Sequence, residues 1–401
     1  MHKKMPKVCI VHDWLYVLGG AERVLEQLLL LFPQADVVTL IDRLPSRDRG
    51  ILTGHRVRTS FIQKLPWALK NHRIYLPLMP MAIEDFDLSE YDLVISSSSA
   101  VAKGVITGPN QPHISYVHSP MRYAWDLQHE YLNATGISRS ANAWLAKLIL
   151  HRIRIWDGRT ANGVDTFVAN SEFIAQRIWK IYRRKATVIH PPIDISSYFP
   201  GGSKSDFYVT ASRLVPYKRI DAIVQAFARL PDRKLVVIGD GPDFEKIKAI
   251  APANVHMMGY QSQDVLRRHL QEARAFIFAA REDFGIAPLE AQACGTPVIA
   301  YGCGGATETI RAQDAPSPTG HFFAEQTPDC IAEAVRAFEL REHDYSPREC
   351  RLNAQRFSPE HFRSAFASLV AQQTNLSISA EEMESRIVPD LPRRIRAVAG
   401  T

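Results

Sequence analysis

Residues 281–290 combine two carboxylates with the predicted start of a helix. The segment reads Arg-Glu-Asp-Phe-Gly-Ile-Ala-Pro-Leu-Glu and lies between an apolar strand-like run and a helical pattern. Glu282 and Glu290 are suited to accept hydrogen bonds from sugar and ribose hydroxyls. Backbone N–H groups at a helix start attract phosphate, and those concerned here belong to Phe284, Gly285 and Ile286. A phosphorylated sugar compound fits this chemistry, although an ordinary acidic helix cap explains the segment equally well.

Two cations, Arg213 and Lys218, follow the first strand-like run of the second half of the chain. A diphosphate leaving group gains negative charge as its bond to the rest of a molecule breaks. Fixed Arg and Lys donors stabilise that charge more in the transition state than in the ground state. The pair therefore indicates a site for a diphosphate leaving group, with a solvated basic loop as the alternative.

Glycines follow two further strand-like runs of the second half. Gly239-Asp-Gly241 resembles part of the dinucleotide-binding fingerprint, but the third glycine of that motif is missing. We interpret this segment as a tight strand-to-helix turn that lines a nucleotide pocket. Gly259 and Tyr260 end the next run, where they are placed to frame the base.

The first half of the chain contains a second set of candidates. Gly19 and Gly20 precede a helical pattern, and their small size lets the backbone approach a phosphate or a sugar closely. His118 opens the segment His118–Asp126, which places an arginine, aromatic residues and an aspartate after a strand-like run. The segment predicts a sugar-facing surface, while a purely structural histidine is the alternative for His118.

Two other patterns invite a functional interpretation. Asp85 and Asp87 form a D-x-D sequence, which holds a metal ion and a nucleotide in some enzymes. They precede a strand instead of following one, so we expect a solvated loop and no metal site. Phe61–Pro80 mixes aromatic residues and leucines with cations, which predicts a membrane-interfacial element or a lipid-acceptor groove. Ordinary packing of a helical insertion accounts for this segment as well.

Strands and helices alternate along the chain in two series, which predicts parallel sheets covered by helices on both faces. The strands expected in the first series are Lys7–Asp13, Val37–Leu40, Leu93–Ser96, Ile114–Val117, Thr166–Ala169 and Thr187–Ile189. Those expected in the second series are Phe207–Ala211, Leu235–Ile238, Val255–Met258, Ala275–Phe278 and Pro297–Ala300. Ligands of such sheets bind at the carboxyl ends of the strands, beside helix N-termini, which is where the candidate residues lie.

Pro191-Pro192 and the stretch 199–206, which contains Gly-Gly-Ser, form the clearest break in the chain. They are typical of an interdomain linker. We therefore expect an N-terminal Rossmann-like domain over residues 1–197 and a C-terminal one over 198–373. A loose basic tail is expected over 374–401.

The composition is ordinary for a globular protein, with 46% hydrophobic and 22% charged residues. The net charge is +6, and residues 1–197 hold 24 Lys and Arg against 17 Asp and Glu. This basic first half suggests an anionic partner such as a membrane surface or a lipid diphosphate, with a solvated basic surface as the alternative. Five cysteines without paired spacing argue against a disulfide framework and favour the cytoplasm.

Together these residues resemble the retaining glycosyltransferases of family 4, which have the GT-B fold of two Rossmann-like doubly wound domains facing a central cleft. The motifs that carry the resemblance are Gly19-Gly20-Ala-Glu22, His118, Arg213 with Lys218, Gly239–Pro242, the Glu282/Glu290 spacing and Gly304-Gly305. They occur in family order up to about residue 373. The segment His118–Asp126, with 169–173, is similar to bacterial mannosyltransferases that use GDP-mannose in polysaccharide assembly.

The resemblance implies a role for each C-terminal candidate. Arg213 and Lys218 hold the diphosphate of a nucleotide sugar. Glu282 contacts hydroxyls of the donor sugar, and Glu290 binds the ribose. The amides of residues 284–286 hold the sugar and the phosphate.

In the N-terminal, acceptor-side domain, the resemblance implies that His118 contacts the donor sugar and that Gly20 allows close approach to the donor. It implies no metal and no cofactor. The acceptor hydroxyl attacks an oxocarbenium-like sugar from the same face as the one from which the leaving group departs. The departing phosphate oxygen takes the proton of the acceptor hydroxyl. No carboxylate is placed as the nucleophile that many retaining glycosidases use.

The sequence thus predicts mannose transfer from GDP-mannose to a lipid-linked (polyprenyl diphosphate) oligosaccharide in exopolysaccharide or O-antigen synthesis. Such a protein is cytoplasmic, with peripheral contact to the inner membrane. The alternatives are a UDP-sugar donor, a nucleotide-sugar epimerase or hydrolase, and a non-catalytic partner subunit. The incomplete glycine fingerprint argues against a dehydrogenase, and the half-acidic candidate site argues against nucleic-acid binding.

Overall fold

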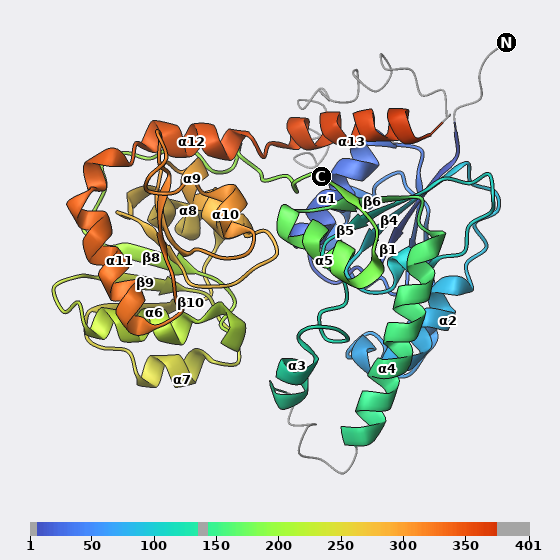
Figure 1. Cartoon of the computed structure of the whole chain (residues 1–401), viewed down its shortest axis with the longest axis horizontal. Helices are drawn as coiled ribbons and strands as arrows, with labels where there is room; N and C mark the ends of the chain where they lie inside the picture. The colour runs from blue at the N-terminus through green and yellow to red at the C-terminus, as the bar shows by residue number, and fades with distance from the viewer. Residues whose placement is uncertain (1–5, 135–142, 375–401) are drawn as a thin grey trace. The chain divides into compact units, whose positions relative to one another are not determined.

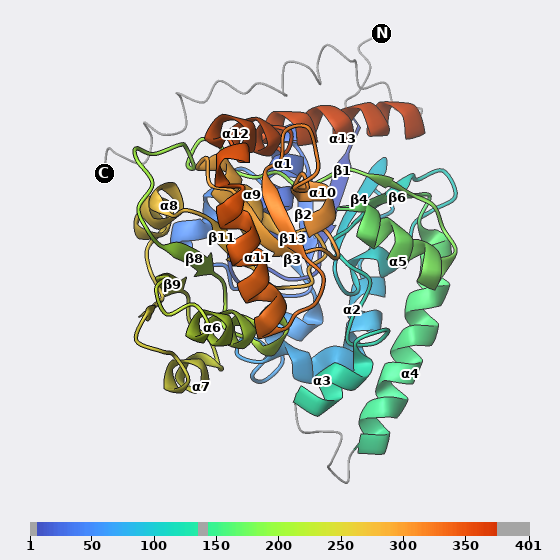
Figure 2. The ribbon, with the colours of Figure 1, turned by 60° about the vertical axis from the view of Figure 1, so that its left-hand side comes forward.

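The computed structural model describes residues 6–134 and 143–374, which form two α/β units, each built on a sheet of parallel strands (Figures 1 and 2). The N-terminal unit is formed within Met1–Pro192 and Pro359–Thr401, and the C-terminal unit is Ile193–Ser358. Each unit has its own sheet and its own buried cores.

The N-terminal unit is built on a parallel sheet of seven strands in the order β3-β2-β1-β4-β5-β6-β7. Its strands are β1 (Val8–His12), β2 (Asp36–Thr39), β3 (Val57–Thr59), β4 (Leu93–Ser98), β5 (His113–Val117), β6 (Thr166–Ala169) and β7 (Ala186–Val188). From β1 the chain adds β2 and then β3 on one side of this strand. It then returns, and β4 pairs with β1 on the opposite side. The carboxyl ends of β1 and β4 therefore flank a topological switch point, where such sheets bind ligands.

Helices cover both faces of this sheet because alternate side chains of each strand point to opposite sides. Ile10 belongs to a core that includes Leu25 and Phe366, whereas Val11 belongs to a second core with Ile83 and Ile153. The α-helices of this unit are α1 (Gly20–Leu31), α2 (Met79–Glu84), α3 (Gln128–Ala134), α4 (Ala143–Thr160), α5 (Glu172–Tyr182) and α13 (Pro359–Gln373).

The C-terminal unit repeats the same plan with six parallel strands in the order β10-β9-β8-β11-β12-β13. The strands are β8 (Tyr208–Ala211), β9 (Leu235–Ile238), β10 (Val255–Gly259), β11 (Phe276–Phe278), β12 (Val298–Tyr301) and β13 (Gly320–Phe323). Its switch point lies between β8 and β11.

The helices of the C-terminal unit again cover two faces. Val237 and Ile277 pack with Phe227 in one core, and Val209 packs with Leu289 in the other. The α-helices are α6 (Ile220–Ala228), α7 (Phe244–Ala249), α8 (Gln263–Glu272), α9 (Ile286–Ala293), α10 (Ala306–Thr309), α11 (Pro328–Leu340) and α12 (Pro347–Gln355). The prediction of two doubly wound parallel sheets is confirmed.

The domain boundary lies earlier than we expected. The chain divides at Pro192/Ile193 and not after residue 197. The Ile193 amide donates to the Phe357 carbonyl oxygen at 2.9 Å, and Arg351 donates to the Ile195 carbonyl oxygen at 2.9 Å. The stretch 199–206, which we interpreted as linker, is a loop of the C-terminal unit, since Gln271 donates to the Phe199 carbonyl oxygen.

Residues 359–373 form the expected helix, but our assignment of this helix to the C-terminal domain is wrong. Helix α13 packs on the N-terminal unit, where Phe362 and Phe366 join the core formed by α1. The Arg363 guanidinium donates to the Gln27 side chain of α1. Burial of an apolar helix face on α1 therefore returns the chain to its first unit. Apart from Thr374, the expected basic tail lies outside the described residues.

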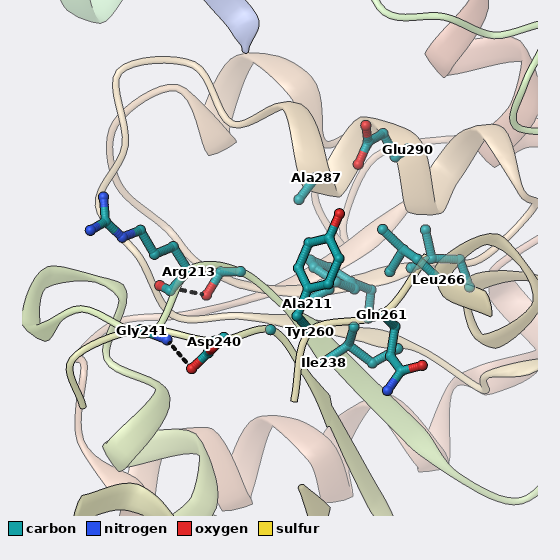
Figure 3. A pocket seen from close by; sticks show the side chains of 14 residues that line it. Ala211, Arg213, Ile238, Asp240, Gly241, Tyr260, Gln261, Leu266, Ala287 and Glu290 are labelled. Atoms are coloured by element: carbon teal, nitrogen blue, oxygen red, sulfur yellow. Dashed lines mark hydrogen bonds between the residues drawn. The ribbon is translucent and has the colours of Figure 1, made fainter. Parts of the chain in front are cut away.

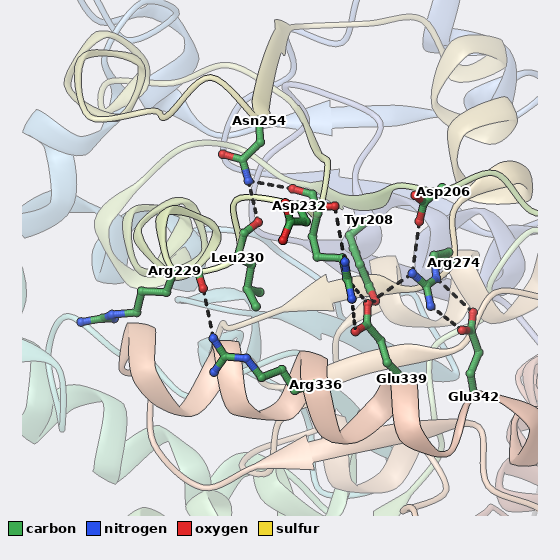
Figure 4. A network of polar contacts seen from close by, with 11 residues as sticks. Asp206, Tyr208, Arg229, Leu230, Asp232, Asn254, Arg274, Arg336, Glu339 and Glu342 are labelled. Atoms are coloured by element: carbon green, nitrogen blue, oxygen red, sulfur yellow. Dashed lines mark hydrogen bonds and ion pairs between the residues drawn. The ribbon is translucent and has the colours of Figure 1, made fainter.

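A polar network at the amino ends of the C-terminal strands ties α11 to the sheet (Figure 4). The Glu339 carboxylate accepts hydrogen bonds from Arg233 Nε at 2.6 Å, from the Tyr208 hydroxyl at 2.8 Å and from Arg274 Nη1 at 3.2 Å. Burial alone would raise the pKa of Glu339, but the hydrogen bonds from Arg233 and Tyr208 and the nearby cations lower it. The ionised carboxylate therefore stabilises this end of the unit.

Replacing this carboxylate tests the network. Glu339→Gln should lower the free energy of unfolding by about 1–3 kcal/mol at neutral pH, because charge-assisted hydrogen bonds are lost. The folded-state pKa is lowered, so the stabilisation is present above the unfolded-state pKa of about 4.3 and disappears as the pH falls through the folded value. Denaturant unfolding at several pH values measures both effects.

Glu333→Gln on the same helix is the matched control, since Glu333 is exposed. It should leave the stability almost unchanged. Equal effects of the two substitutions would contradict the role given to Glu339.

Candidate functional site

A cavity of about 520 Å³ lies at the carboxyl edge of the C-terminal sheet, at its switch point (Figure 3). A cavity of this size suits a drug-sized or cofactor-sized ligand. The residues that line it are Ala211, Ser212, Arg213, Ile238, Gly239, Asp240, Gly241, Tyr260, Gln261, Leu266, Leu270, Phe276, Ala287 and Glu290. We call this cavity the C-terminal pocket.

Five of the predicted residues meet at this pocket: Arg213, Gly239, Gly241, Tyr260 and Glu290. Arg213 follows β8 and has an exposed side chain. Figure 3 shows Arg213 and Asp240 on one side of the pocket and Glu290 on the other, with the Tyr260 ring between them. A cation and a carboxylate thus stand at separate places in one cavity.

The two glycines after β9 allow the loop after β9 to approach the loop after β8 closely. Gly239 and Gly241 have φ values of +132° and +159°. A Cβ atom on Gly239 would lie 1.8 Å from the Ser212 carbonyl oxygen, and one on Gly241 would lie 2.3 Å from the Leu214 carbonyl oxygen. Their absent side chains let the loop that carries Arg213 pack against the loop after β9.

Glu290 is held on α9 beside a buried tyrosine. The Tyr198 hydroxyl is hydrogen-bonded to the Glu290 carboxylate, and burial together with that negative charge raises the pKa of Tyr198. Sequence reasoning missed Tyr198, which lies between Pro191-Pro192 and the stretch 199–206 that we interpreted as linker. Gln261 and Leu266 were missed as well, although both follow the carboxyl end of a predicted strand.

Lys218 and Glu282 do not line the pocket but form an ion pair with each other. Both side chains are mostly buried, with 17% and 18% of their surface exposed. The cation predicted for a diphosphate and the carboxylate predicted for sugar hydroxyls are therefore mutually neutralised in this structure.

The loop that carries Glu282 rests on two glycines. The Gly305 amide donates to the Glu282 carbonyl oxygen at 2.9 Å. A Cβ atom on Gly305 would lie 2.3 Å from Phe284 Cα, and one on Gly304 would lie 2.5 Å from the Glu282 carbonyl oxygen. The Gly304-Gly305 pair therefore fixes the position of this loop.

Helix α9 begins as predicted, with Gly285 before it at φ +90° and Ile286 as its first residue. Phe284, Gly285 and Ile286 are not among the residues that line the C-terminal pocket, whereas the next residue, Ala287, lines it. Gly259 ends β10 and accepts a hydrogen bond from the Gly239 amide at 2.8 Å, while the adjacent Tyr260 lines the cavity.

In the N-terminal unit, Gly19 and Gly20 open α1 as expected, but the amide of Gly19 already has a partner. It donates to Glu22 Oε2 at 3.0 Å. The Glu22 carboxylate is buried, and its other oxygen, Oε1, lies 3.6 Å from His12 Nε2. A carboxylate of the chain thus takes the position at Gly19 where we expected a phosphate or a sugar.

His118 is joined to this group through Ser97 at the end of β4. The Ser97 hydroxyl lies 2.8 Å from His118 Nε2 and 3.1 Å from His12 Nδ1. Burial, with a smaller contribution from His12, lowers the pKa of His118 to about 3. His118 is therefore neutral at physiological pH.

The acceptor-only carboxylate of Glu22 favours a proton on His12 Nε2, so that His12 Nδ1 accepts from the Ser97 hydroxyl. Ser97 then accepts from His118 Nε2–H, and His118 Nδ1 is left as a hydrogen-bond acceptor. Sequence reasoning missed His12 and Ser97, although His12 lies near the end of one predicted strand and Ser97 directly follows another.

Asp13, after β1, was also missed. Its buried carboxylate accepts the amides of Ser99 (2.6 Å), Ala100 (2.9 Å), Val101 (2.8 Å) and Ala102 (2.7 Å). These bonds fix the loop after β4 at the switch point.

Asp85 and Asp87 are exposed, and Asp87 accepts hydrogen bonds from the amide and the hydroxyl of Ser89. The predicted solvated loop is confirmed. Within residues 6–134 and 143–374, no three His, Cys, Asp or Glu side chains are grouped in a way that suits a metal ion.

The same ranges contain no helix with the length and apolarity that crossing a membrane requires.

Two family models match successive parts of the chain. Residues 18–197 match the model of Glycosyltransferase Family 4, and residues 200–357 match that of glycosyl transferases group 1. Among curated relatives, D-inositol 3-phosphate glycosyltransferase of Mycobacterium sp. (strain JLS) is 26% identical over 183 residues, which are 39% of this chain and 42% of the relative. N-acetyl-alpha-D-glucosaminyl L-malate synthase of Bacillus anthracis is 29% identical over 201 residues, 48% of this chain and 49% of the relative. Each match spans less than half of the relative's length.

Solved structures agree on the fold. The structure of Anabaena HepE in complex with UDP and glucose has a TM-score of 0.64 at 17% identity and covers 91% of this chain and 99% of its own. Sucrose-phosphate synthase from Thermosynechococcus elongatus has a TM-score of 0.66 at 16% identity, covering 91% and 98%. Residues 18–197 and 200–357 therefore each match a glycosyltransferase family model, and the chain has the GT-B fold.

Proposed function

We propose that this protein transfers a sugar from a nucleotide-sugar donor to an acceptor hydroxyl and retains the anomeric configuration. The observation that carries the proposal is the C-terminal pocket, which combines Arg213, the Gly239–Gly241 turn and Glu290 at one switch point. Arg213 suits the diphosphate, and Glu290 suits the ribose hydroxyls. The exposed ring of Tyr260, 80% accessible, offers a face for the base.

The ion pair of Lys218 with Glu282 supplies the next step of the proposal. A bound diphosphate competes for the Lys218 ammonium, and hydroxyls of the donor sugar replace it at the Glu282 carboxylate. Two cations then face the diphosphate as it leaves, where they stabilise charge that is larger in the transition state than in the ground state. The departing phosphate oxygen takes the proton of the acceptor hydroxyl, which attacks from the same face.

We propose that neutral His118 accepts a hydrogen bond from a sugar hydroxyl through Nδ1. Glu22, His12 and Ser97 act as positioning residues that set its tautomer.

For the donor we propose GDP-mannose, and for the acceptor a lipid-linked oligosaccharide of exopolysaccharide or O-antigen synthesis at the cytoplasmic face of the inner membrane. Support comes from the resemblance of His118–Asp126 to bacterial mannosyltransferases. A UDP-sugar is the second candidate, because the structure of HepE was determined with UDP-glucose. The named activities of the curated relatives, on inositol phosphate and malate, give two further acceptor classes to test.

A donor panel tests the proposal directly. The purified protein is incubated with GDP-mannose, UDP-glucose, UDP-GlcNAc and UDP-galactose in the presence of EDTA. Thermal stabilisation reports binding, and sugar incorporation into a bacterial lipid-linked oligosaccharide extract reports transfer. Stabilisation by GDP-mannose with mannose incorporation supports the full proposal, and stabilisation by a UDP-sugar replaces only the donor. Turnover without an acceptor favours an epimerase or a hydrolase, and no response to any donor favours a non-catalytic subunit.

Arg213→Ala should reduce kcat/KM by about a hundredfold or more, because a fixed cation at the leaving group is lost. Steady-state kinetics with the active donor measure the effect. Arg348→Ala, an exposed arginine of the same unit, should leave kcat/KM unchanged. Similar losses in both variants would contradict the role of Arg213.

Gly305→Ala should abolish donor binding while the protein stays folded. The added methyl group would displace the backbone of Phe284 and with it the loop of Glu282. Isothermal titration with the active donor measures binding. Gly202→Ala is the control, since a Cβ atom there meets nothing within 4 Å. Unchanged donor affinity in Gly305→Ala would refute the need for this loop geometry.

His118→Gln should flatten the dependence of thermal stability on pH between about pH 7 and about pH 5. The folded-state pKa of about 3 lies below the unfolded value of about 6.5, so the unfolded state binds the proton first and stability falls as the pH drops. One such histidine contributes a slope of about 1.4 kcal/mol per pH unit. His129→Gln, at an exposed position, is the control. An unaltered slope in His118→Gln would show that His118 titrates normally.

A further inference from the structure

A second cavity, of about 480 Å³, lies entirely within the N-terminal unit. Trp14, Ser99 and Ser119 place it at the carboxyl edge of the sheet, because they follow β1, β4 and β5. Ser119 is the neighbour of His118 in the chain. The cavity therefore opens at the same edge as the residues that we assign to the sugar.

Most of the cavity wall is apolar or aromatic. The 3-10 helix η3 (His72–Leu78) contributes Ile74, Leu76 and Pro77, and α4 contributes Ala146, Ile149 and Leu150. Figures 1 and 2 both show α3 and α4 in the same part of this unit, and Tyr131 and Leu132 of α3 also line the cavity. Such a wall suits a hydrocarbon chain better than a sugar.

The charge of the lining has one sign. Among the described residues that line the cavity, Arg73 and Arg122 are cations and none is an aspartate or a glutamate. His72 adds no charge, because burial, with a smaller effect of Arg73, lowers its pKa to about 4. The cavity thus favours a ligand with an anionic group.

The elements around the cavity also carry exposed apolar side chains. Their exposed fractions are 73% for Trp67, 48% for Ile74, 55% for Met81, 67% for Trp144 and 40% for Leu148. Arg73, which precedes Ile74 in the chain, and Lys147, which precedes Leu148, are exposed as well. Apolar side chains beside cations are typical of a surface that meets anionic lipid.

We propose that this cavity binds the acceptor as a lipid-linked diphosphate. The hydrocarbon chain lies against η3 and α4, and Arg73 and Arg122 bind the diphosphate at the carboxyl edge of the sheet. This inference rests on the proposed function, since it assigns a site to the lipid-linked acceptor proposed there.

Isothermal titration of the full chain without a donor tests the site. The probes are farnesyl diphosphate, inorganic diphosphate and farnesol. Farnesyl diphosphate should bind at least about tenfold more tightly than either other probe, because only it satisfies both the cations and the apolar wall. Equal affinity for inorganic diphosphate would reduce the cavity to an anion site, and equal affinity for farnesol would reduce it to an apolar one; either result overturns the proposal.

Variants locate the binding. Arg73→Ala, at an exposed position, should weaken farnesyl diphosphate about tenfold, and Leu76→Asp should weaken it further. Arg56→Ala, an exposed arginine of the same unit, is the matched control and should have no effect. Arg213→Ala should also have no effect. A loss in Arg213→Ala with none in Arg73→Ala would place the ligand in the C-terminal pocket and refute the proposal.

The proposed function can fail independently. A protein that binds farnesyl diphosphate through Arg73 but transfers no sugar would retain the lipid site and lose the transferase assignment. A protein that transfers sugar only to water-soluble acceptors and does not bind farnesyl diphosphate would retain the transferase assignment and lose the lipid site.

Discussion

The strand order of each sheet reverses beside its first strand, β1 in the N-terminal unit and β8 in the C-terminal unit. Connections leave in opposite directions there, so the carboxyl ends of two adjacent strands are open to a ligand. The C-terminal pocket, the Ser97–His118 contact and the second cavity, between η3 and α4, all lie at such edges. The rest of each unit, two helical layers over a parallel sheet, keeps these edges in place.

Close backbone approach determines what the C-terminal edge can bind. Gly239 and Gly241 bring two strand-end loops into contact, and Gly305 supports the loop of Glu282. The same packing determines where the charged side chains lie. Lys218 pairs with Glu282, and neither lines the C-terminal pocket, whereas Arg213 does. In the N-terminal unit, burial keeps His118 neutral. The chemistry that we assign to the site follows from these constraints on position and protonation.

Much of the fold was predictable because buried parallel strands are apolar runs of characteristic length. The strands Thr166–Ala169 and Leu235–Ile238 have the predicted bounds, whereas β3 and β13 were missed because Val57–Thr59 and Gly320–Phe323 are short or polar. The return of α13 to the N-terminal unit was not predictable, since it depends on the apolar face of α1.

The candidate site was predictable where a residue follows a strand, as Arg213 and Gly239 do. Contacts between distant segments were not, and they include Tyr198 with Glu290 and Lys218 with Glu282. The carboxylate of Glu22 at the Gly19 amide also escaped the prediction, because a motif shows which residues are present and not which of them pair.

Hydrogen–deuterium exchange of the whole protein with and without GDP or UDP tests most directly whether the C-terminal pocket binds the donor nucleotide. We predict slower exchange on nucleotide binding in residues 211–218, 239–241 and 282–290, and no change in residues 231–236 at the opposite edge of the sheet. Protection confined to residues 231–236, or bound nucleotide without protection of the three pocket segments, would contradict the account.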